Sequence, residues 1–193
     1  IKRLLKALDA KSGHARFVGG AGRDFLLGEH PGDLDLATTH RPDEVVRRLE
    51  KAGIKAIPTG IDHGTVTAIS SGTIVEVTSL RADVSTDGRR ATVAFTDDWK
   101  QDAGRRDFTI NALYADPYSG ELHDYYGGLE DLGSRTVRFI GEPLQRIAED
   151  HLRILRYFRF HARYGHGEPD PHALQACTER ANHLMALSRE RIA

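Results

Sequence analysis

The sequence predicts an α+β fold, in which a head of strands and helices over residues 1–140 is followed by an all-helical region over residues 141–193. Three observations predict this division. Apolar and β-branched runs alternate with turn residues throughout the first part. From Pro143 onward, apolar residues recur only at helical spacing. The composition, 39% hydrophobic and 28% charged, is that of a globular protein with a packed core.

The head begins with a predicted strand, a glycine turn and a short helix. Residues 15–18 form the strand, Gly19-Gly20 the turn, and residues 23–28 the helix, which a glycine ends. Residues 33–36 alternate polar and apolar side chains, which predicts a second strand. Residues 42–53 then form a helix that begins with proline and ends with glycine.

Three more strands are predicted at residues 54–58, 65–69 and 74–80. Residues 70–72, Ser-Ser-Gly, join the last two as a hairpin turn. Residues 81–90 are polar and contain an Asp-Gly pair, so we expect an exposed loop there.

The remaining head is expected to contain a helix over residues 98–114, a turn at 118–120 and a last strand at 136–140. The region that follows is expected to be helical, with one break at residues 165–167 and a new helix starting at Asp170-Pro171.

Charge and cysteine content limit the function classes. The 27 basic and 28 acidic residues give a net charge of −1, so any contact with a nucleic acid must use local basic patches. Cys177 is the single cysteine, which excludes an internal disulfide. No apolar run approaches the roughly 20 residues that span a bilayer, and no signal peptide opens the chain, so we expect a cytoplasmic protein without a membrane partner. Ile1 is not an initiator residue, and residues 188–193 resemble the start of a helix, which favours a fragment of a longer protein.

The strongest local candidate for a site is the pair Asp33 and Asp35. A strand places both carboxylates on one side, and such hard oxygen ligands, completed by substrate phosphates, suit Mg²⁺. Gly19 and Gly20 strengthen the case, because a glycine turn before a helix lets backbone N–H groups approach a phosphate. In isolation, the aspartates are more often surface residues and the glycines a simple tight turn. A dinucleotide-binding fingerprint is disfavoured, because Phe25 occupies the position of its third glycine.

Four blocks in a fixed order resemble class II tRNA nucleotidyltransferases (CCA-adding enzymes) and the related bacterial poly(A) polymerases. They are residues 19–38, 105–113, 124–132 and 149–156. The resemblance implies a polymerase-β-like nucleotidyltransferase head with a mixed or antiparallel sheet, followed by a helical neck. Gly22 departs from the family pattern, in which valine is expected.

The resemblance implies that Asp33 and Asp35 hold Mg²⁺ while CTP and ATP are added to the 3′ end of tRNA, with release of pyrophosphate. Glu76 is a candidate third carboxylate if its strand neighbours the aspartate strand, and an exposed strand residue is an equally good interpretation. Arginines suit triphosphate oxygens because of their forked donors. The implied nucleotide-binding residues are Gly19, Gly20, Arg23, Arg106, Asp107, Asn111, Asp150, Arg153, Arg156 and Arg159.

Asp150 and Arg153 are expected to share one face of a helix, either as an ordinary ion pair or as the base-selecting pair. A carboxylate beside a guanidinium matches the amino donor and ring-nitrogen acceptor of cytosine and adenine. Uracil and guanine present the reverse order and would leave buried groups unpaired, at about 1–3 kcal/mol per group. Arg156, Arg159 and Arg163 continue as a basic stripe that binds phosphates or is merely solvated.

Other functions stay open at this stage. One is a poly(A) polymerase, and another is an enzyme that adds only CC or only A. Residues 57–67 look like CCA-adding enzymes, whereas the polymerases typically carry a basic segment there, and residues 87–90 resemble the loop implicated in the switch from C to A addition. A catalytically silent RNA-binding module is disfavoured because Asp33 and Asp35 are both present. The sequence predicts no oligomeric state.

Overall fold

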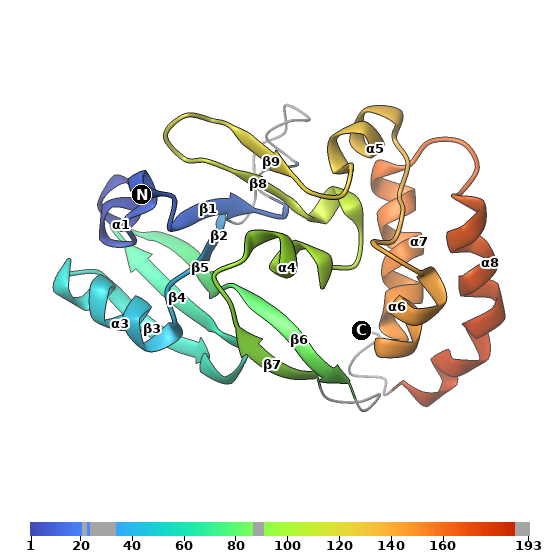
Figure 1. Cartoon of the computed structure of the whole chain (residues 1–193), viewed down its shortest axis with the longest axis horizontal. Coiled ribbons are helices and arrows are strands. Elements are labelled where there is room, and N and C mark those ends of the chain that lie inside the picture. Colours follow the sequence, from blue (N-terminus) through green and yellow to red (C-terminus); the bar gives the residue numbers. More distant parts are fainter. Residues whose placement is uncertain (21–22, 24–33, 87–90, 188–193) are drawn as a thin grey trace.

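The computed structural model describes residues 1–20, 23, 34–86 and 91–187, with the backbone alone for residues 83–86 and 91–93. In this part of the chain, Figure 1 shows a large sheet, a separate two-stranded ribbon and a group of helices, α6 to α8, at one end of the molecule.

The large sheet is mixed, as predicted. Its strand order is β3-β4-β5-β2-β1-β8-β9, and β2 pairs with β5 in parallel, whereas the other neighbours are antiparallel. The strands are β1 (Ala15–Val18), β2 (Leu34–Thr38), β3 (Lys55–Gly60), β4 (Thr65–Ser70), β5 (Thr73–Ser79), β8 (Leu113–Ala115) and β9 (Leu122–Asp124).

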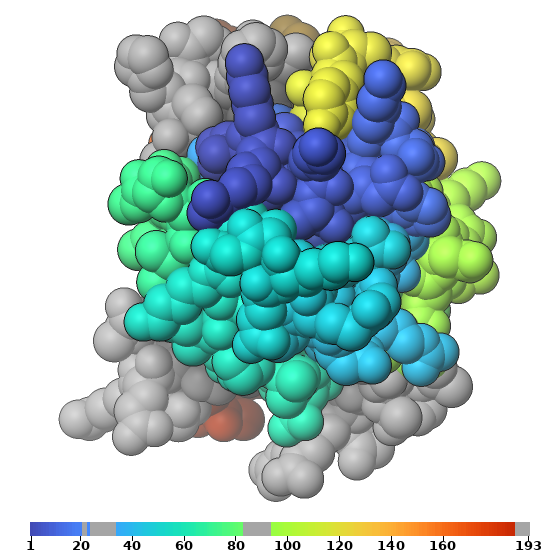
Figure 2. All heavy atoms as spheres, turned by 90° about the vertical axis from the view of Figure 1, so that its left-hand side faces the viewer, coloured from blue at the N-terminus to red at the C-terminus, as the bar shows by residue number. Residues whose placement is uncertain are grey.

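Helices α1 (Lys2–Ala7) and α3 (Pro42–Lys51) cover one face of this sheet, which Figure 2 shows with the N-terminal residues in blue above α3 in cyan. Strands β4 and β5 alternate buried and less buried residues, as strands with one covered face do. Their inward side chains pack with α1 and α3 into a core that includes Leu4, Leu36, Leu49, Val66, Val75 and Val77.

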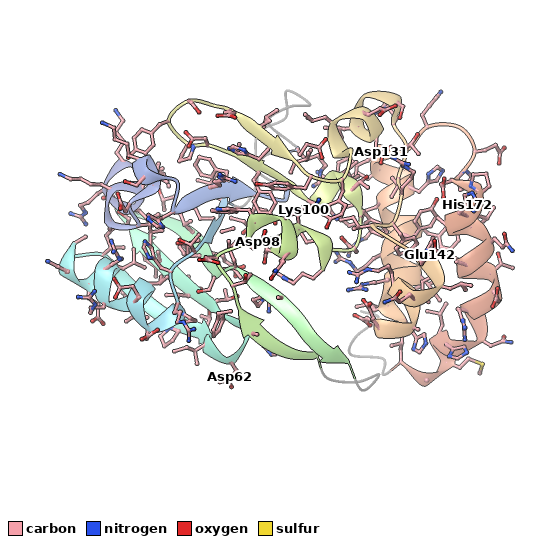
Figure 3. The ribbon with its side chains drawn as sticks, viewed as in Figure 1. Asp62, Asp98, Lys100, Asp131, Glu142 and His172 are labelled. Carbon is pink, nitrogen blue, oxygen red and sulfur yellow. The ribbon has the colours of Figure 1, made fainter. Side chains whose placement is uncertain are left out.

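Helix α4 (Trp99–Gly104) packs on the opposite face, where Ala103 joins Val18 and Ala37 in a second core. Asp98 caps this helix by accepting hydrogen bonds from the N–H groups of Lys100 (2.8 Å) and Gln101 (3.2 Å) (Figure 3).

The later helices are α5 (Gly128–Ser134), α6 (Pro143–Glu149), α7 (Leu152–Tyr164) and α8 (Pro171–Arg180), with short 3₁₀ turns at Ala10–Ser12, Ile61–His63, Thr109–Asn111 and Ala181–Ala186. Beyond residue 141 the described elements are all helical, as predicted. A third core joins this region to the head, because Phe108 and Leu113 pack with Ile147, Ile154 and Tyr157.

The predicted helix over residues 98–114 is wrong beyond Gly104. There the chain turns into a short 3₁₀ segment and then into β8. The Asp107 carboxylate accepts the N–H of Phe108 at 2.8 Å, a local bond that competes with helix continuation. Strands β8 and β9 flank the predicted turn at 118–120, and each has three residues, too few to show a period of two.

Two other expectations are also corrected. Residues 81–90 were expected to be a loop, but β6 (Arg81–Thr86) pairs with β7 (Ala91–Phe95) in a two-stranded ribbon, and residues 87–90 lie outside the described residues. Ala82 and Val84 alternate with polar residues as in a strand, but the Asp-Gly pair that follows favoured a loop in the prediction. The predicted strand at 136–140 is reduced to a single bridge between Phe139 and Phe108.

Candidate active site

Asp35 and Glu76 lie opposite each other on the paired parallel strands β2 and β5. Their neighbours Leu36, Val75 and Val77 point into the core beneath α1 and α3, so both carboxylates lie on the other face. This confirms that the two strands are neighbours. Asp33 lies outside the described residues.

The donor set on this face fits Mg²⁺. Asp35 is half-buried and Glu76 is exposed, and carboxylates from one or two residues, completed by substrate phosphates, are what Mg²⁺ uses in such sites. Within the described residues, no group of three His, Cys, Asp or Glu side chains is placed to hold a metal ion. The fit therefore rests on the pair together with a ligand's own oxygens.

The glycine turn lies beside Arg106. Gly19 has φ +67°, and a Cβ there would lie 4.0 Å from Arg106 Nη1. The Arg23 N–H donates to the Gly19 carbonyl at 3.2 Å, and Gly20 is already helical, so the predicted order of strand, turn and helix is confirmed for these residues. A helix start next to a guanidinium is a place suited to phosphate.

Asp102, which sequence reasoning did not single out, anchors the arginines of this region. Its carboxylate accepts hydrogen bonds from Tyr114 Oη (2.7 Å), Arg106 Nη2 (3.2 Å), Arg105 Nη2 (2.8 Å) and the Arg81 N–H (3.0 Å). Burial by itself raises the pKa of Asp102, but the two guanidinium groups and these bonds hold it below its usual value. The available signal was the spacing, since Arg105 and Arg106 follow Asp102 by three and four residues in a stretch predicted to be helical.

Tyr114 contributes to the same cluster as a neutral hydroxyl. Burial raises the pKa of Tyr114, so the phenol stays protonated and its O–H donates a hydrogen bond to Asp102. Arg106 Nε in turn donates to this hydroxyl at 3.3 Å. Arg106 is therefore held from two sides, with its Nη1 directed toward the glycine turn.

A second chain of polar contacts links Arg23, which follows the glycine turn, to α7. Arg23 Nη1 donates to Asn111 Oδ1 at 2.6 Å, and Asn111 Nδ2 donates to Asp107 Oδ1 at 2.9 Å. Asp107 Oδ2 accepts from Arg156 Nε at 2.7 Å and pairs with its Nη2 at 2.6 Å. Burial raises the pKa of Asp107, but Arg156 and Asn111 hold it below its usual value. Four of the predicted nucleotide-binding residues are thus brought together.

Several arginines lie against aromatic rings of α7. The Arg23 guanidinium lies 4.0 Å from the centre of the Tyr164 ring and 5.4 Å from that of Phe160. Arg156 and Arg159 lie 5.4 Å and 6.0 Å from the Phe160 centre. These are cation–π distances. The predicted basic stripe is therefore divided: Arg156 is engaged with the head, whereas Arg159 is exposed.

The expectation that Asp150 and Arg153 share one helix is wrong. Helix α6 ends at Glu149, Asp150 is extended (φ −155°, ψ 107°), and α7 begins at Leu152. The Asp150 side chain accepts the Leu152 N–H at 3.1 Å, a local turn bond just before α7, whose N-cap residue is His151. The two residues remain close, because the Arg153 N–H donates to the Asp150 carbonyl at 3.0 Å.

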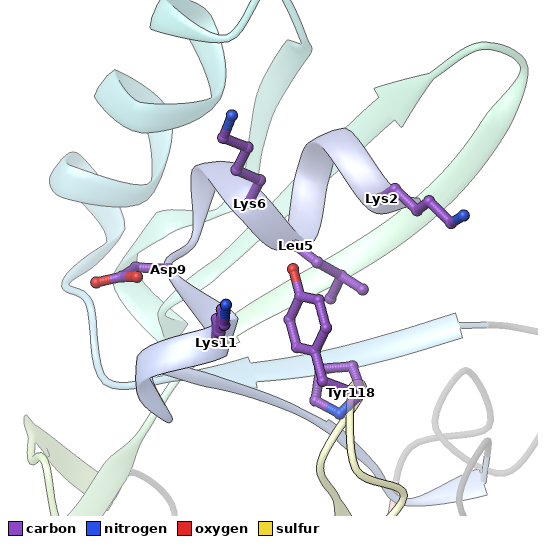
Figure 4. Close-up of a pocket in the computed structure, with 7 residues that line it drawn as sticks. Lys2, Leu5, Lys6, Asp9, Lys11 and Tyr118 are labelled. Atoms are coloured by element: carbon purple, nitrogen blue, oxygen red, sulfur yellow. The ribbon is translucent and has the colours of Figure 1, made fainter.

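A hollow of about 540 Å³ lies elsewhere, between the N-terminal segment and the β8–β9 turn (Figure 4). It is lined by Lys2, Leu5, Lys6, Asp9, Lys11, Pro117 and Tyr118. No predicted site residue lines it, so it is separate from the candidate active site.

Known proteins resemble the chain over its whole length. Residues 15–138 match the model of the poly(A) polymerase head domain family. The human protein named CCA tRNA nucleotidyltransferase 1, mitochondrial, is 46% identical over 195 residues, a match that covers 100% of this chain and 45% of that protein.

Solved structures of tRNA nucleotidyltransferases also resemble the chain. A CCA-adding enzyme from Bacillus stearothermophilus in complex with CTP is 35% identical with a TM-score of 0.84, covering 98% of this chain and 46% of that one. A tRNA nucleotidyltransferase complexed with a primer tRNA and an incoming ATP analog is 27% identical with a TM-score of 0.75, covering 96% and 53%. The chain spans about half the length of the relatives it matches.

Among the described helices, none combines the length and apolar character needed to cross a membrane.

Proposed function

The chain belongs to the class II family of CCA-adding enzymes and poly(A) polymerases, and from this premise we propose that it is the catalytic part of an enzyme that adds CCA to the 3′ end of tRNA from CTP and ATP. The observation that carries the proposal is the placement of Asp35 opposite Glu76 on adjacent strands, on the sheet face that α1 and α3 leave uncovered. The names of the relatives supply the substrates, CTP, ATP and tRNA.

In this proposal Asp33 and Asp35 hold Mg²⁺, with Glu76 as a further carboxylate on the same face. When bound, Mg²⁺ supplies charge neutralisation at the attacking and leaving oxygens of the phosphoryl centre. The residues of the chain bind and orient. Gly19 and Gly20 offer backbone N–H groups to the triphosphate, and the Arg106 guanidinium beside them is the forked donor for its oxygens.

The chain of polar contacts from Arg23 to α7 supports a second set of roles. Arg23, Asp107 and Asn111 form the ribose side of the site, and Arg156 connects it to α7. Asp150 and Arg153 recognise the base edge. Arg159 is exposed on α7 and is proposed to contact RNA phosphate.

The same proposal assigns residues 1–140 to a nucleotidyltransferase head and residues 141–193 to a helical neck. It also places the protein in the cytoplasm, supported by its single, buried and unpaired Cys177. Cell fractionation tests this location against the mitochondrial one in the human relative's name.

The test is an incorporation assay with the protein that carries this chain, Mg²⁺ and a tRNA that lacks its terminal triplet. Each nucleoside triphosphate is supplied separately and in mixture, and the product ends are sequenced. We expect CCA ends and release of pyrophosphate. A run of A indicates a poly(A) polymerase, and CC or A alone indicates a partial enzyme. RNA binding without incorporation indicates a silent module and refutes the proposal.

Asp35→Asn is the matched variant. It keeps the size of the side chain and removes the charge, so we expect loss of both CTP and ATP incorporation with unchanged folding. Near-normal turnover would refute the metal assignment. Glu76→Gln, made in parallel, tests the further carboxylate.

A further inference from the structure

Arg146 on α6 bonds in two directions. Its Nη2 donates to the carbonyl oxygen of Arg106 at 2.8 Å and also to the carbonyl of Arg105. Its Nη1 forms an ion pair with Glu149 at 2.7 Å. One planar guanidinium therefore connects the backbone that follows α4 to the end of α6.

Glu149 continues this connection to Arg153. The same Glu149 oxygen, Oε2, accepts from Arg153 Nη1 at 2.6 Å. Arg153 Nη1 also donates to the Arg146 carbonyl at 2.8 Å. Both bonds use Arg153 Nη1, and neither uses Nε or Nη2. These bonds therefore orient the guanidinium through one of its three nitrogens.

The three side chains are shielded from water. The exposed fractions are 10% for Arg146, 15% for Glu149 and 15% for Arg153. In such surroundings charged hydrogen bonds are stronger than at the surface, and the loss of one partner is costly because the others stay desolvated.

We infer that Arg146 is a positioning residue that fixes the base-selecting Arg153 relative to the phosphate-side Arg106, an inference that rests on the proposed function. Arg106 lies beside Gly19, the proposed phosphate turn, and Arg153 is proposed to read the base. Arg146 contacts the backbone of the first and, through Glu149, the side chain of the second. It thereby sets the distance between the two ends of one bound nucleotide.

A purely structural role makes a different prediction. The carbonyls of Arg105 and Arg106 directly follow α4, and a basic side chain at that place can simply cap the helix end. A cap would change stability and leave the choice of base untouched. The choice of base is therefore the decisive readout.

Arg146→Lys tests the inference, because lysine keeps the charge but has one nitrogen and cannot make both sets of bonds. The kcat and KM for CTP and UTP are measured separately on tRNA that lacks its terminal triplet. We expect the preference for CTP over UTP to fall about tenfold, as for the loss of one charged hydrogen bond, with a higher KM for CTP and an unchanged Mg²⁺ dependence. Arg47→Lys is the matched control, since Arg47 pairs with Glu44 at 2.6 Å on the exposed side of α3.

Unchanged discrimination in a folded Arg146→Lys protein overturns the inference. If that variant does not fold, Glu149→Gln decides, because glutamine keeps the length but weakens the link to Arg153. Loosened base choice there supports the inference, and retained choice overturns it. If the unaltered protein incorporates neither CTP nor ATP, the proposed function itself has failed.

Discussion

Replacing Asp102 by asparagine should destabilise the protein strongly, although the change removes only a charge. The Asp102 side chain is 1% exposed and forms ion pairs with Arg105 and Arg106, whose side chains are 15% and 19% exposed. Asparagine keeps one acceptor oxygen but turns a donor NH₂ toward groups that are themselves donors. From the cost of breaking a buried charge pair, we expect a loss of about 3 kcal/mol in the free energy of unfolding.

Glu44→Gln is the matched control, because Glu44 also pairs with arginines three and four residues later, Arg47 and Arg48. The Glu44 side chain is 26% exposed, so solvent screens the pairs and we expect a loss within about 1 kcal/mol. Urea denaturation at pH 7 measures both variants. Equal losses would show that burial does not decide the strength of these pairs and would refute the reasoning.

Three further predictions follow. The pKa values of Asp102 and Asp107 are lowered in the folded state, so their ion pairs stabilise the fold above the ordinary carboxylate value of about 4 and are lost as the pH falls below it. Urea midpoints should drop as the pH falls below about 4, and a flat profile from pH 4 down to pH 3 would contradict this. Arg153→Ala should loosen base choice without changing Mg²⁺ dependence, and retained rejection of UTP in incorporation assays would exclude the selecting role. Burial raises the pKa of Cys177 to about 11, so a thiol reagent at pH 8 should label the folded protein far more slowly than the unfolded one, and equal rates would contradict its burial.

The sequence predicted those parts of the fold that have a clear period or a strong turn signal. The α3 helix, the β4–β5 hairpin and the start of α8 at Asp170-Pro171 are present close to the expected positions. Residues 81–86 were misassigned because the polar residues and the Asp-Gly pair that follows them indicated a loop, although Ala82 and Val84 alternate with polar residues as in a strand. The break at Asp150 was missed because one extended residue between two helices leaves the apolar spacing on either side nearly intact.

The candidate site was predictable where sequence neighbours are also neighbours in space. The register of Asp35 and Glu76 could be expected only on the condition that their strands pair, a tertiary fact. The hydrogen bonds that link Arg23, Asn111 and Arg156 through Asp107 join residues far apart in the chain, and no local sequence pattern predicts them. The role of Arg146 could not be predicted for the same reason, since its partners Arg105 and Arg106 are about forty positions earlier in the sequence.

The core around Phe108 has a practical consequence for dissecting the protein. Phe108 and Leu113 belong to the first 140 residues, yet the side chains that cover them, among them Ile147 and Tyr157, come from α6 and α7. A shortened chain that stops at residue 140 would present these aromatic and aliphatic groups to water and be prone to aggregate. The boundary at 140 thus marks a change in the type of element, and expression trials should keep both sides of it together.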